Sequence, residues 1–385
     1  MNHVKGDKIL TRSQCDVLRG LAIIGIFLHN FCHWLHGAHH ENEYLFFLEH
    51  GQRSWDYWTS GVDAFAPIQF FSFFGHYGVP LFLFLSGFGL VMKYEHEGSK
   101  RVGAWCFIKY QWLKLFRLMV LGFFVTMAVY IACGSDPHPF NETIAQLALI
   151  ENFLFQSPGS AVVPGPYWFF GLMFEVYVIY RMLIYSTGKH TTWRWLMPVC
   201  LTLVAWLSMA PNKCHTTILE YLRYNAAVAM LPFALGVLVA RYGLPAMSRW
   251  VFLLVAAVSI PLIALANLNY QAWLWAPVLV IAAAVAFVKL FEGYSLQATG
   301  ILMRLLAWVG GLSSFIFVVH SVPRMPIFKF VLWQQRQLML TDYAWLVVYI
   351  SLTFLLAWLY KMYLKLLPSP RLKCLSNSIS NIIRS

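Results

Sequence analysis

The sequence predicts an all-α membrane protein with about ten transmembrane helices and both termini in the cytoplasm. The chain has 385 residues, of which 59% are hydrophobic and only 11% are charged, whereas a soluble domain carries about 25% charged residues. The mean hydropathy of +0.62 also fits only a chain with many apolar spans. These observations exclude a soluble enzyme and make the lipid bilayer the first expected partner.

The hydropathy pattern divides the chain into spans that are each long enough to cross a membrane. A transmembrane helix needs roughly 20 mainly apolar residues. In chain order the expected spans are 16–35, 77–94, 112–133, 167–186, 194–210, 224–241, 250–267, 272–290, 303–321 and 343–366. The predicted domains are a cytoplasmic segment 1–15, a membrane domain 16–367 and a cytoplasmic tail 368–385.

The basic residues sort to one side of this ten-span arrangement. With the N-terminus inside, 22 of the 28 Lys and Arg residues fall on the cytoplasmic side, as the positive-inside rule requires for a protein of the inner cell membrane. The net charge of +12 would otherwise suggest a nucleic-acid partner. Because the charges sit in short clusters between apolar spans, no nucleic-acid partner is predicted.

The connections between the spans are unequal in length. The shortest is a tight turn at 267–271, and the inner connection 95–117 is strongly basic. On the outer side, 36–76 and 134–166 are long and 322–342 is moderate, and long loops are uncommon unless they have a function. A short amphipathic stretch near 142–155 is expected to lie on the membrane surface.

The first span contains the most informative residues. Asp16 and Arg19 lie at one end, while His29, His33 and His36 lie toward the other. Ionisable groups inside a membrane segment are costly and usually mark a pathway or an active site. Taken alone, Arg19 is either an anchor at the inner surface or a clamp for phosphate. His29 is either a hydrogen-bonded core residue or a general base for a hydroxyl.

Other polar residues of the spans allow two interpretations each. The basic residues Lys109, Lys114 and Arg117 form either a solvated inner loop or a phosphate contact. Glu175 lies within an apolar span and therefore needs a partner or a proton. His320 closes the ninth span, either as an interfacial cap or as a site residue.

Five segments resemble the acyltransferase 3 family of membrane acyltransferases, in the order in which that family has them. They are DVLRGLAIIGIFLH (16–29), YGVPLFLFLSGFGL (77–90), FIKYQWLKLFRLMVLG (107–122), YWFFGLMFEVYVIY (167–180) and WVGGLSSFIFVVH (308–320). The resemblance runs from about residue 14 to 366. It implies transfer of an acyl group, usually acetyl, from cytoplasmic acyl-CoA to a hydroxyl of an extracytoplasmic glycan or glycolipid.

The resemblance also implies roles for individual residues. His29 becomes the catalytic candidate. His33 is the reserve candidate because it lies one turn beyond His29, and Asn30 is the candidate donor that the oxyanion of the transfer step needs. Contacts with acyl-CoA are expected at Arg19, Lys109, Lys114 and Arg117. Glu175 is expected to support catalysis, and Trp168 and His320 are expected to contact the acceptor. Nine residues separate Arg19 from His29, one fewer than in the family pattern, so Asn30 rather than His29 lies in phase with Arg19 on a helix.

Other classes of function remain as alternatives. A transporter or flippase for a polar lipid or glycan would use similar polar groups inside the membrane. The cluster His36, His39, His40, Glu41 and Glu43 has no strong metal-ligand spacing, so no metal site is predicted. We expect no permanently bound cofactor, and acetyl-CoA acts as the donor substrate.

Overall fold

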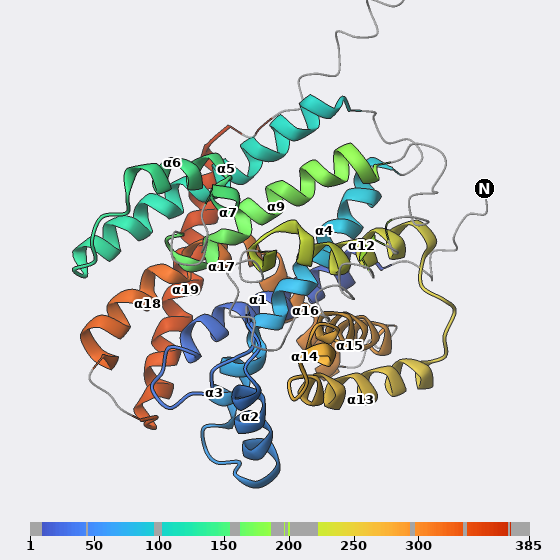
Figure 1. The fold of residues 1–385 in the computed structure, drawn as a ribbon, viewed down its shortest axis with the longest axis horizontal. Coiled ribbons are helices and arrows are strands. Elements are labelled where there is room, and N and C mark those ends of the chain that lie inside the picture. Colours follow the sequence, from blue (N-terminus) through green and yellow to red (C-terminus); the bar gives the residue numbers. More distant parts are fainter. Residues whose placement is uncertain are drawn as a thin grey trace, which may run out of the picture.

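The computed structural model is helical throughout its described part (Figure 1). It describes residues 10–43, 45–95, 102–154, 162–185, 196, 199–200, 222–292, 297–333, 337–368 and 370. Within these ranges no strand occurs. Among the described residues, eight helical segments are long and apolar enough to cross a membrane, and two shorter apolar helices span Ala276–Leu290 and Gly300–Gly310. The predicted all-α membrane protein is therefore confirmed.

The first half of the chain contributes α1 (Arg12–Cys32), α2 (Leu48–Ser60), α3 (Ala66–Phe74), η2 (Gly75–Tyr77), α4 (Gly78–Tyr94), α5 (Ala104–Ala132), α6 (Phe140–Ala148), α7 (Glu151–Leu154), η3 (Gly165–Tyr167), α9 (Trp168–Ile179) and η4 (Tyr180–Ile184). The second half contributes α12 (Ala226–Tyr242), α13 (Arg249–Ala266), α14 (Tyr270–Trp273), α15 (Ala276–Leu290), α16 (Gln297–Gly310), α17 (Ser313–Val319), α18 (Ser321–Ile327), η5 (Phe328–Leu332) and α19 (Thr341–Leu366).

Helix α1 begins at a capping box and runs through the centre of the bundle. The Thr11 side chain accepts from the Gln14 backbone N–H at 3.2 Å, and the Gln14 side chain accepts from the Thr11 N–H at 2.9 Å. This reciprocal pair satisfies two of the amides that a helix start leaves without partners. The helix then packs mainly against α16, α4 and α3, so its ionisable residues lie among other helices (Figure 1).

The remaining helices associate in pairs around α1. Figure 1 shows α13 beside α15 at one side of the molecule and α5 beside α9 at the other. Helix α4 packs along α12, and α17 packs against α19. The exposed surfaces of α13 and α19 are rich in Leu, Val, Ile and Trp, as expected for helices that face lipid.

The predicted span 303–321 is wrong in its boundaries. It combines the end of α16 with the start of a second helical segment, Ser313–Leu332. The helix ends at the pair Gly310 and Gly311, since glycine has a low helix propensity. The moderate outer loop expected at 322–342 is helical up to Leu332. The predicted turn at 267–271 is confirmed, since α13 ends at Ala266. The expected span 194–210 lies almost wholly outside the described residues.

Glycines let α1 and α16 approach closely. A Cβ at Gly20 would lie 2.0 Å from the Leu306 carbonyl oxygen, and one at Gly310 would lie 1.8 Å from the Asp16 carbonyl oxygen. Small residues at such crossings allow backbones to touch in membrane proteins. This contact fixes the part of α1 that carries Asp16 and Arg19.

We expect Gly20→Ala to destabilise the protein, because the added methyl group must push α16 away from α1. Overpacking of this kind costs about 1–3 kcal/mol. Gly89→Ala in α4 is the matched control, since a Cβ there meets nothing within 4 Å. Thermal unfolding in detergent should show a lower Tm for Gly20→Ala alone. Equal melting of both variants would contradict the close packing of this crossing.

Candidate active site

Two cavities lie along α1 and divide its polar residues between them. The larger, of about 830 Å³, is here named the basic cavity, and its charged lining residues are Asp16, Arg19, Lys114, Arg117, Lys361 and Lys365. The smaller, of about 400 Å³, is named the histidine cavity, and its ionisable lining residues include His29, His33, Glu41, Glu43, His76 and Arg324. One cavity is therefore suited to an anion and the other to proton transfer.

Two aromatic side chains separate the cavities. Phe169 of α9 and Phe317 of α17 line both of them, and their ring centroids are 5.4 Å apart. Arg19 and His29 lie on either side of this boundary, about 15 Å apart along α1 at a rise of roughly 1.5 Å per residue. A molecule held in the basic cavity would have to pass Phe169 and Phe317 to reach His29.

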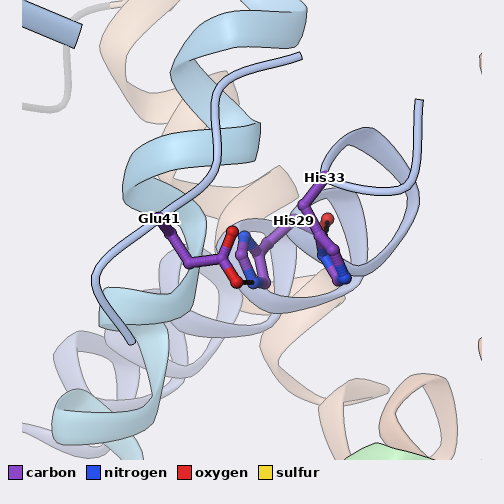
Figure 2. A group of neighbouring side chains, drawn as sticks. All are labelled: His29, His33 and Glu41. Carbon is purple, nitrogen blue, oxygen red and sulfur yellow. Dashed lines mark hydrogen bonds and ion pairs between the residues drawn. The ribbon is translucent and has the colours of Figure 1, made fainter. Parts of the chain in front are cut away.

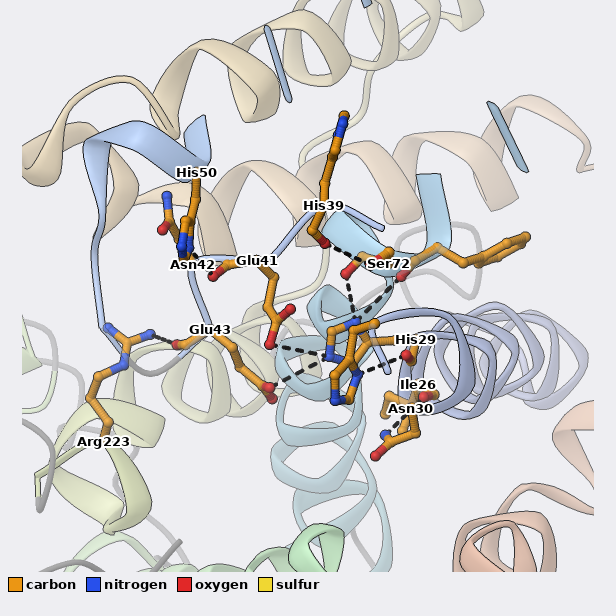
Figure 3. Close-up of polar contacts among 12 residues, drawn as sticks. Ile26, His29, Asn30, His39, Glu41, Asn42, Glu43, His50, Ser72 and Arg223 are labelled. Carbon is orange, nitrogen blue, oxygen red and sulfur yellow. Dashed lines mark hydrogen bonds and ion pairs between the residues drawn. The ribbon is translucent and has the colours of Figure 1, made fainter. Parts of the chain in front are cut away.

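The backbone of α3 fixes the orientation of the His29 ring. His29 Nδ1 lies 2.9 Å from the Ser72 carbonyl oxygen and 3.3 Å from that of Phe71. Because a carbonyl only accepts, Nδ1 carries the hydrogen, and in the neutral ring the lone pair is on Nε2. Nε2 is buried and has no hydrogen-bond partner in the described part of the chain. This arrangement, drawn in Figure 3, gives His29 the form of a general base.

Two carboxylates of the loop after α1 face the same nitrogen. Oε2 of Glu43 lies 3.6 Å from His29 Nε2, and Oε1 of Glu41 lies 3.9 Å from it. Both distances exceed a hydrogen bond but allow strong electrostatic attraction once the ring is protonated. Burial raises the pKa of Glu41, and the charge of His29 opposes that rise.

The loop that carries these carboxylates is held by its backbone. Arg223 donates to the Glu43 carbonyl oxygen, and the Trp273 indole donates to the Asn42 carbonyl at 2.7 Å. His50 Nδ1 lies 3.0 Å from the Glu41 carbonyl. Partners from three separate parts of the chain thus hold the loop that places Glu41 and Glu43 beside His29, and Figure 3 shows two of these partners, Arg223 and His50.

His33 lies one helical turn beyond His29 and stacks on it. Their ring centroids are 4.5 Å apart, and His33 Nδ1 lies 2.8 Å from the His29 carbonyl oxygen. Burial and the neighbouring charges of His29 and Arg324 lower the pKa of His33 well below its ordinary value. His33 lines the same cavity as His29.

Arg324 brings a buried cation to the histidine cavity. Its Nη1 donates to the backbone oxygen of Asn30 at 2.9 Å and to its side-chain oxygen at 3.0 Å. Its guanidinium carbon lies 4.3 Å above the Trp34 ring. The Asn30 amide nitrogen donates to the Ile26 carbonyl of its own helix. The oxyanion donor expected at Asn30 thus has a cationic neighbour from the segment that the sequence predicts as the outer loop 322–342.

The basic residues predicted to bind the donor are found in different places. Arg19 pairs with Asp16 at 2.5 Å and lines the basic cavity, as does Lys114. Arg117 also lines this cavity, but it donates to the Leu364 and Leu367 carbonyls at the end of α19. Lys109 is exposed on α5 and lines neither cavity.

The three residues expected to support catalysis or bind the acceptor, Trp168, Glu175 and His320, lie in different places. Trp168 lines the histidine cavity. Glu175 lies behind it and accepts from the Ala226 backbone N–H at 2.9 Å, where it caps the start of α12. His320 is fully buried outside both cavities, with Nδ1 2.8 Å from the carbonyl of the boundary residue Phe317.

Several residues of the site escaped sequence analysis. Glu41 and Glu43 were considered only as weak metal ligands, because nothing in the sequence indicates that a loop folds back onto His29. Arg324 could have been identified as a candidate site residue from the sequence. With the span at Ser313–Leu332, Arg324 falls near its middle, where an ionisable residue suggests a functional site.

Comparison with known proteins identifies the family. A family model described as an acyltransferase domain matches residues 12–362, nearly the whole chain. The search of curated proteins found no match, and neither did the search of solved structures. The match covers α1, the histidine cavity, most of the basic cavity and most of α19, and it agrees with the resemblance seen in five separate motifs. The chain therefore belongs to the acyltransferase 3 family and is a membrane acyltransferase.

Proposed function

We propose that this protein is an O-acyltransferase of the inner cell membrane that takes an acyl group, acetyl first of all, from cytoplasmic acyl-CoA. The acceptor is a hydroxyl of an extracytoplasmic glycan or glycolipid. One observation carries the proposal: a cationic cavity and a cavity holding a histidine base meet at Phe169 and Phe317. The excess of Lys and Arg on one side supports a cytoplasmic opening for the basic cavity.

The donor half of the reaction uses the basic cavity. Coenzyme A carries phosphates, for which Arg is a bidentate partner and Lys a point charge. Arg19, Lys114 and Lys361 come from three different helices and would surround such a group. The acyl-pantetheine arm would then extend past Phe169 and Phe317 toward His29.

The chemical step uses His29 as the base. Its Nε2 takes the proton of the acceptor hydroxyl, whose oxygen attacks the thioester carbonyl. The charge of Glu43 stabilises the imidazolium that forms, and Arg324 stabilises the oxyanion. When the carbon–sulfur bond breaks, the thiolate of CoA receives the proton from His29. Direct transfer is preferred, and an acyl-histidine intermediate is the alternative that single-turnover labelling would detect.

A transporter or flippase is the competing function for the same fold class. Such a protein would move its substrate without consuming acyl-CoA. The assay that separates the two functions follows free CoA release by purified protein, with His29→Ala as the control for hydrolysis that does not use the site.

The donor site is tested with a pair of variants that each remove one positive charge. Arg19→Ala should weaken CoA binding by about tenfold or more, because a charge-assisted hydrogen bond contributes about 1.5–3 kcal/mol. Lys109→Ala should bind like the wild type, since Lys109 is exposed and lines neither cavity. Calorimetry at fixed salt measures both affinities. Equal weakening by the two variants would mean that the attraction comes from the general charge of the surface and that the basic cavity is not the donor site.

A further inference from the structure

The two histidines of α1 and a carboxylate of the following loop form a second kind of site. We propose that His29, His33 and Glu41 bind a divalent transition-metal ion, with Zn²⁺ as the best fit, and that the bound ion blocks acyl transfer. The binding part stands on the geometry of the three side chains. The inhibitory part rests on the proposed function, because it requires His29 to be the base.

The three ligand atoms already lie close together. One imidazole nitrogen from each histidine and one Glu41 oxygen lie within 4.8 Å of one another (Figure 2). Tetrahedral zinc with bonds of about 2.0–2.1 Å holds its ligand atoms roughly 3.4 Å apart. Closing the site therefore needs side-chain movements of about 1 Å. Glu43, with Oε2 3.6 Å from His29 Nε2, can supply a fourth ligand.

The backbone prepares both histidines to bind through Nε2. His29 Nδ1 faces the Ser72 carbonyl at 2.9 Å, and His33 Nδ1 faces the His29 carbonyl at 2.8 Å. Histidines that bind metal almost always donate their other N–H to a carbonyl or carboxylate, which fixes the tautomer and the ring. Spacing of four residues places the two rings on one face of α1, and Figure 2 shows both beside the Glu41 carboxylate.

Unpaired polar atoms point into the same space. Within the described residues, the buried atoms His29 Nε2 and Glu41 Oε2 have no hydrogen-bond partner. The His29 side chain is 3% exposed, so bulk water does not compensate for the missing partner. Two neighbouring carboxylates in a buried cavity also favour a divalent cation. Two nitrogen ligands select a transition metal over Mg²⁺ or Ca²⁺, which prefer oxygen alone.

Metal binding and base catalysis exclude each other at His29. An ion on Nε2 occupies the lone pair that would accept the proton of the acceptor hydroxyl. The bound ion therefore inhibits the transferase, and a chelator restores its activity.

The site is tested by metal binding to the full-length protein in detergent, first stripped with a chelator. Calorimetry with ZnCl₂ alone should show one tight ion per chain, and X-ray absorption should show imidazole ligands. Glu41→Gln, which keeps the size of the side chain, and His33→Ala should each weaken binding by about tenfold or more. His36→Ala is the matched control, because His36 is exposed and outside the cluster, and it should bind like the wild type.

The outcomes separate this proposal from the proposed function. Zinc binding that both Glu41→Gln and His33→Ala retain at wild-type strength would overturn the metal site, as would the absence of a tight ion. Neither measurement contains an acyl donor, so neither result tests the assignment as a transferase. Zinc binding with the expected variant pattern, in a protein that releases no CoA from acetyl-CoA even after a chelator has removed the ion, would support the site and count against acetyl-CoA as the donor. Zinc that binds in this pattern and accelerates transfer would overturn the inhibitory role.

Discussion

Replacing His29 with alanine is expected to lower acyl transfer by about 10²- to 10⁴-fold, the usual contribution of a general base. The physical reason lies in the His29 ring, whose Nδ1 is committed to the Ser72 carbonyl and whose Nε2 faces the cavity without a hydrogen-bond partner in the described structure. CoA binding should remain, because His29 is outside the basic cavity. Initial rates of CoA release and calorimetry with CoA measure the two effects separately.

His33→Ala is the comparison that tests this assignment. His33 stacks on His29 and lines the same cavity, so its loss should alter the orientation of the base and reduce transfer less than loss of His29. If His33→Ala abolishes transfer and His29→Ala leaves it near the wild-type rate, His33 is the base. That result would also show that the shortened spacing between Arg19 and His29 shifts the catalytic role by one turn.

Arg324→Met should lower kcat by about 10²- to 10³-fold, which is the usual effect of removing one oxyanion donor. Methionine fills much of the same space and keeps the apolar contacts, but it donates no hydrogen bond. Because the oxyanion exists only in the transition state, KM should change much less than kcat.

Two controls separate this catalytic role from a structural one. Lys329→Met removes a positive charge from an exposed position of η5 near Arg324 in the chain, and it should leave kcat unchanged. Thermal unfolding shows whether loss of the hydrogen bonds from Arg324 to Asn30 merely separates α18 from α1. A variant that melts early but turns over at the wild-type rate per folded molecule would contradict the oxyanion role.

The elements that sequence reasoning predicts well are those with local signals. α1 follows from a continuous apolar run with ionisable groups at its two ends, and the break between α13 and α14 follows from the short polar turn that starts at Asn267. The amphipathic stretch expected near 142–155 overlaps α6 (Phe140–Ala148). These features depend on periodicity and composition over about one span, so a single sequence contains them.

The boundary error at 303–321 comes from the use of hydropathy alone. Apolar residues continue across Gly310 and Gly311, so hydropathy suggests one span, whereas the helix ends at this glycine pair because glycine has a low helix propensity. Gly310 also packs against the backbone of α1, a contact that the local sequence does not contain. This error also hid Arg324, which seemed to lie in a loop.

The site shows the same division between local and long-range information. The sequence predicts Arg19 and His29 as site residues because both lie on one helix. Glu43 lies near His29 on a loop that Arg223 and Trp273 hold from distant parts of the chain. The boundary formed by Phe169 and Phe317 joins two helices far apart in sequence, and aromatic residues are too common in membrane spans to stand out.

Determining the structure with a non-hydrolysable acetyl-CoA analogue tests most directly whether the two cavities form one reaction path. The account predicts phosphate density beside Arg19 and Lys114, a pantetheine arm between Phe169 and Phe317, and the acyl group within reach of His29 Nε2. Arg19→Ala under the same conditions should lose the phosphate density. An analogue bound with its phosphates in the histidine cavity, or with its acyl group remaining on the Arg19 side of Phe169 and Phe317, would contradict the account.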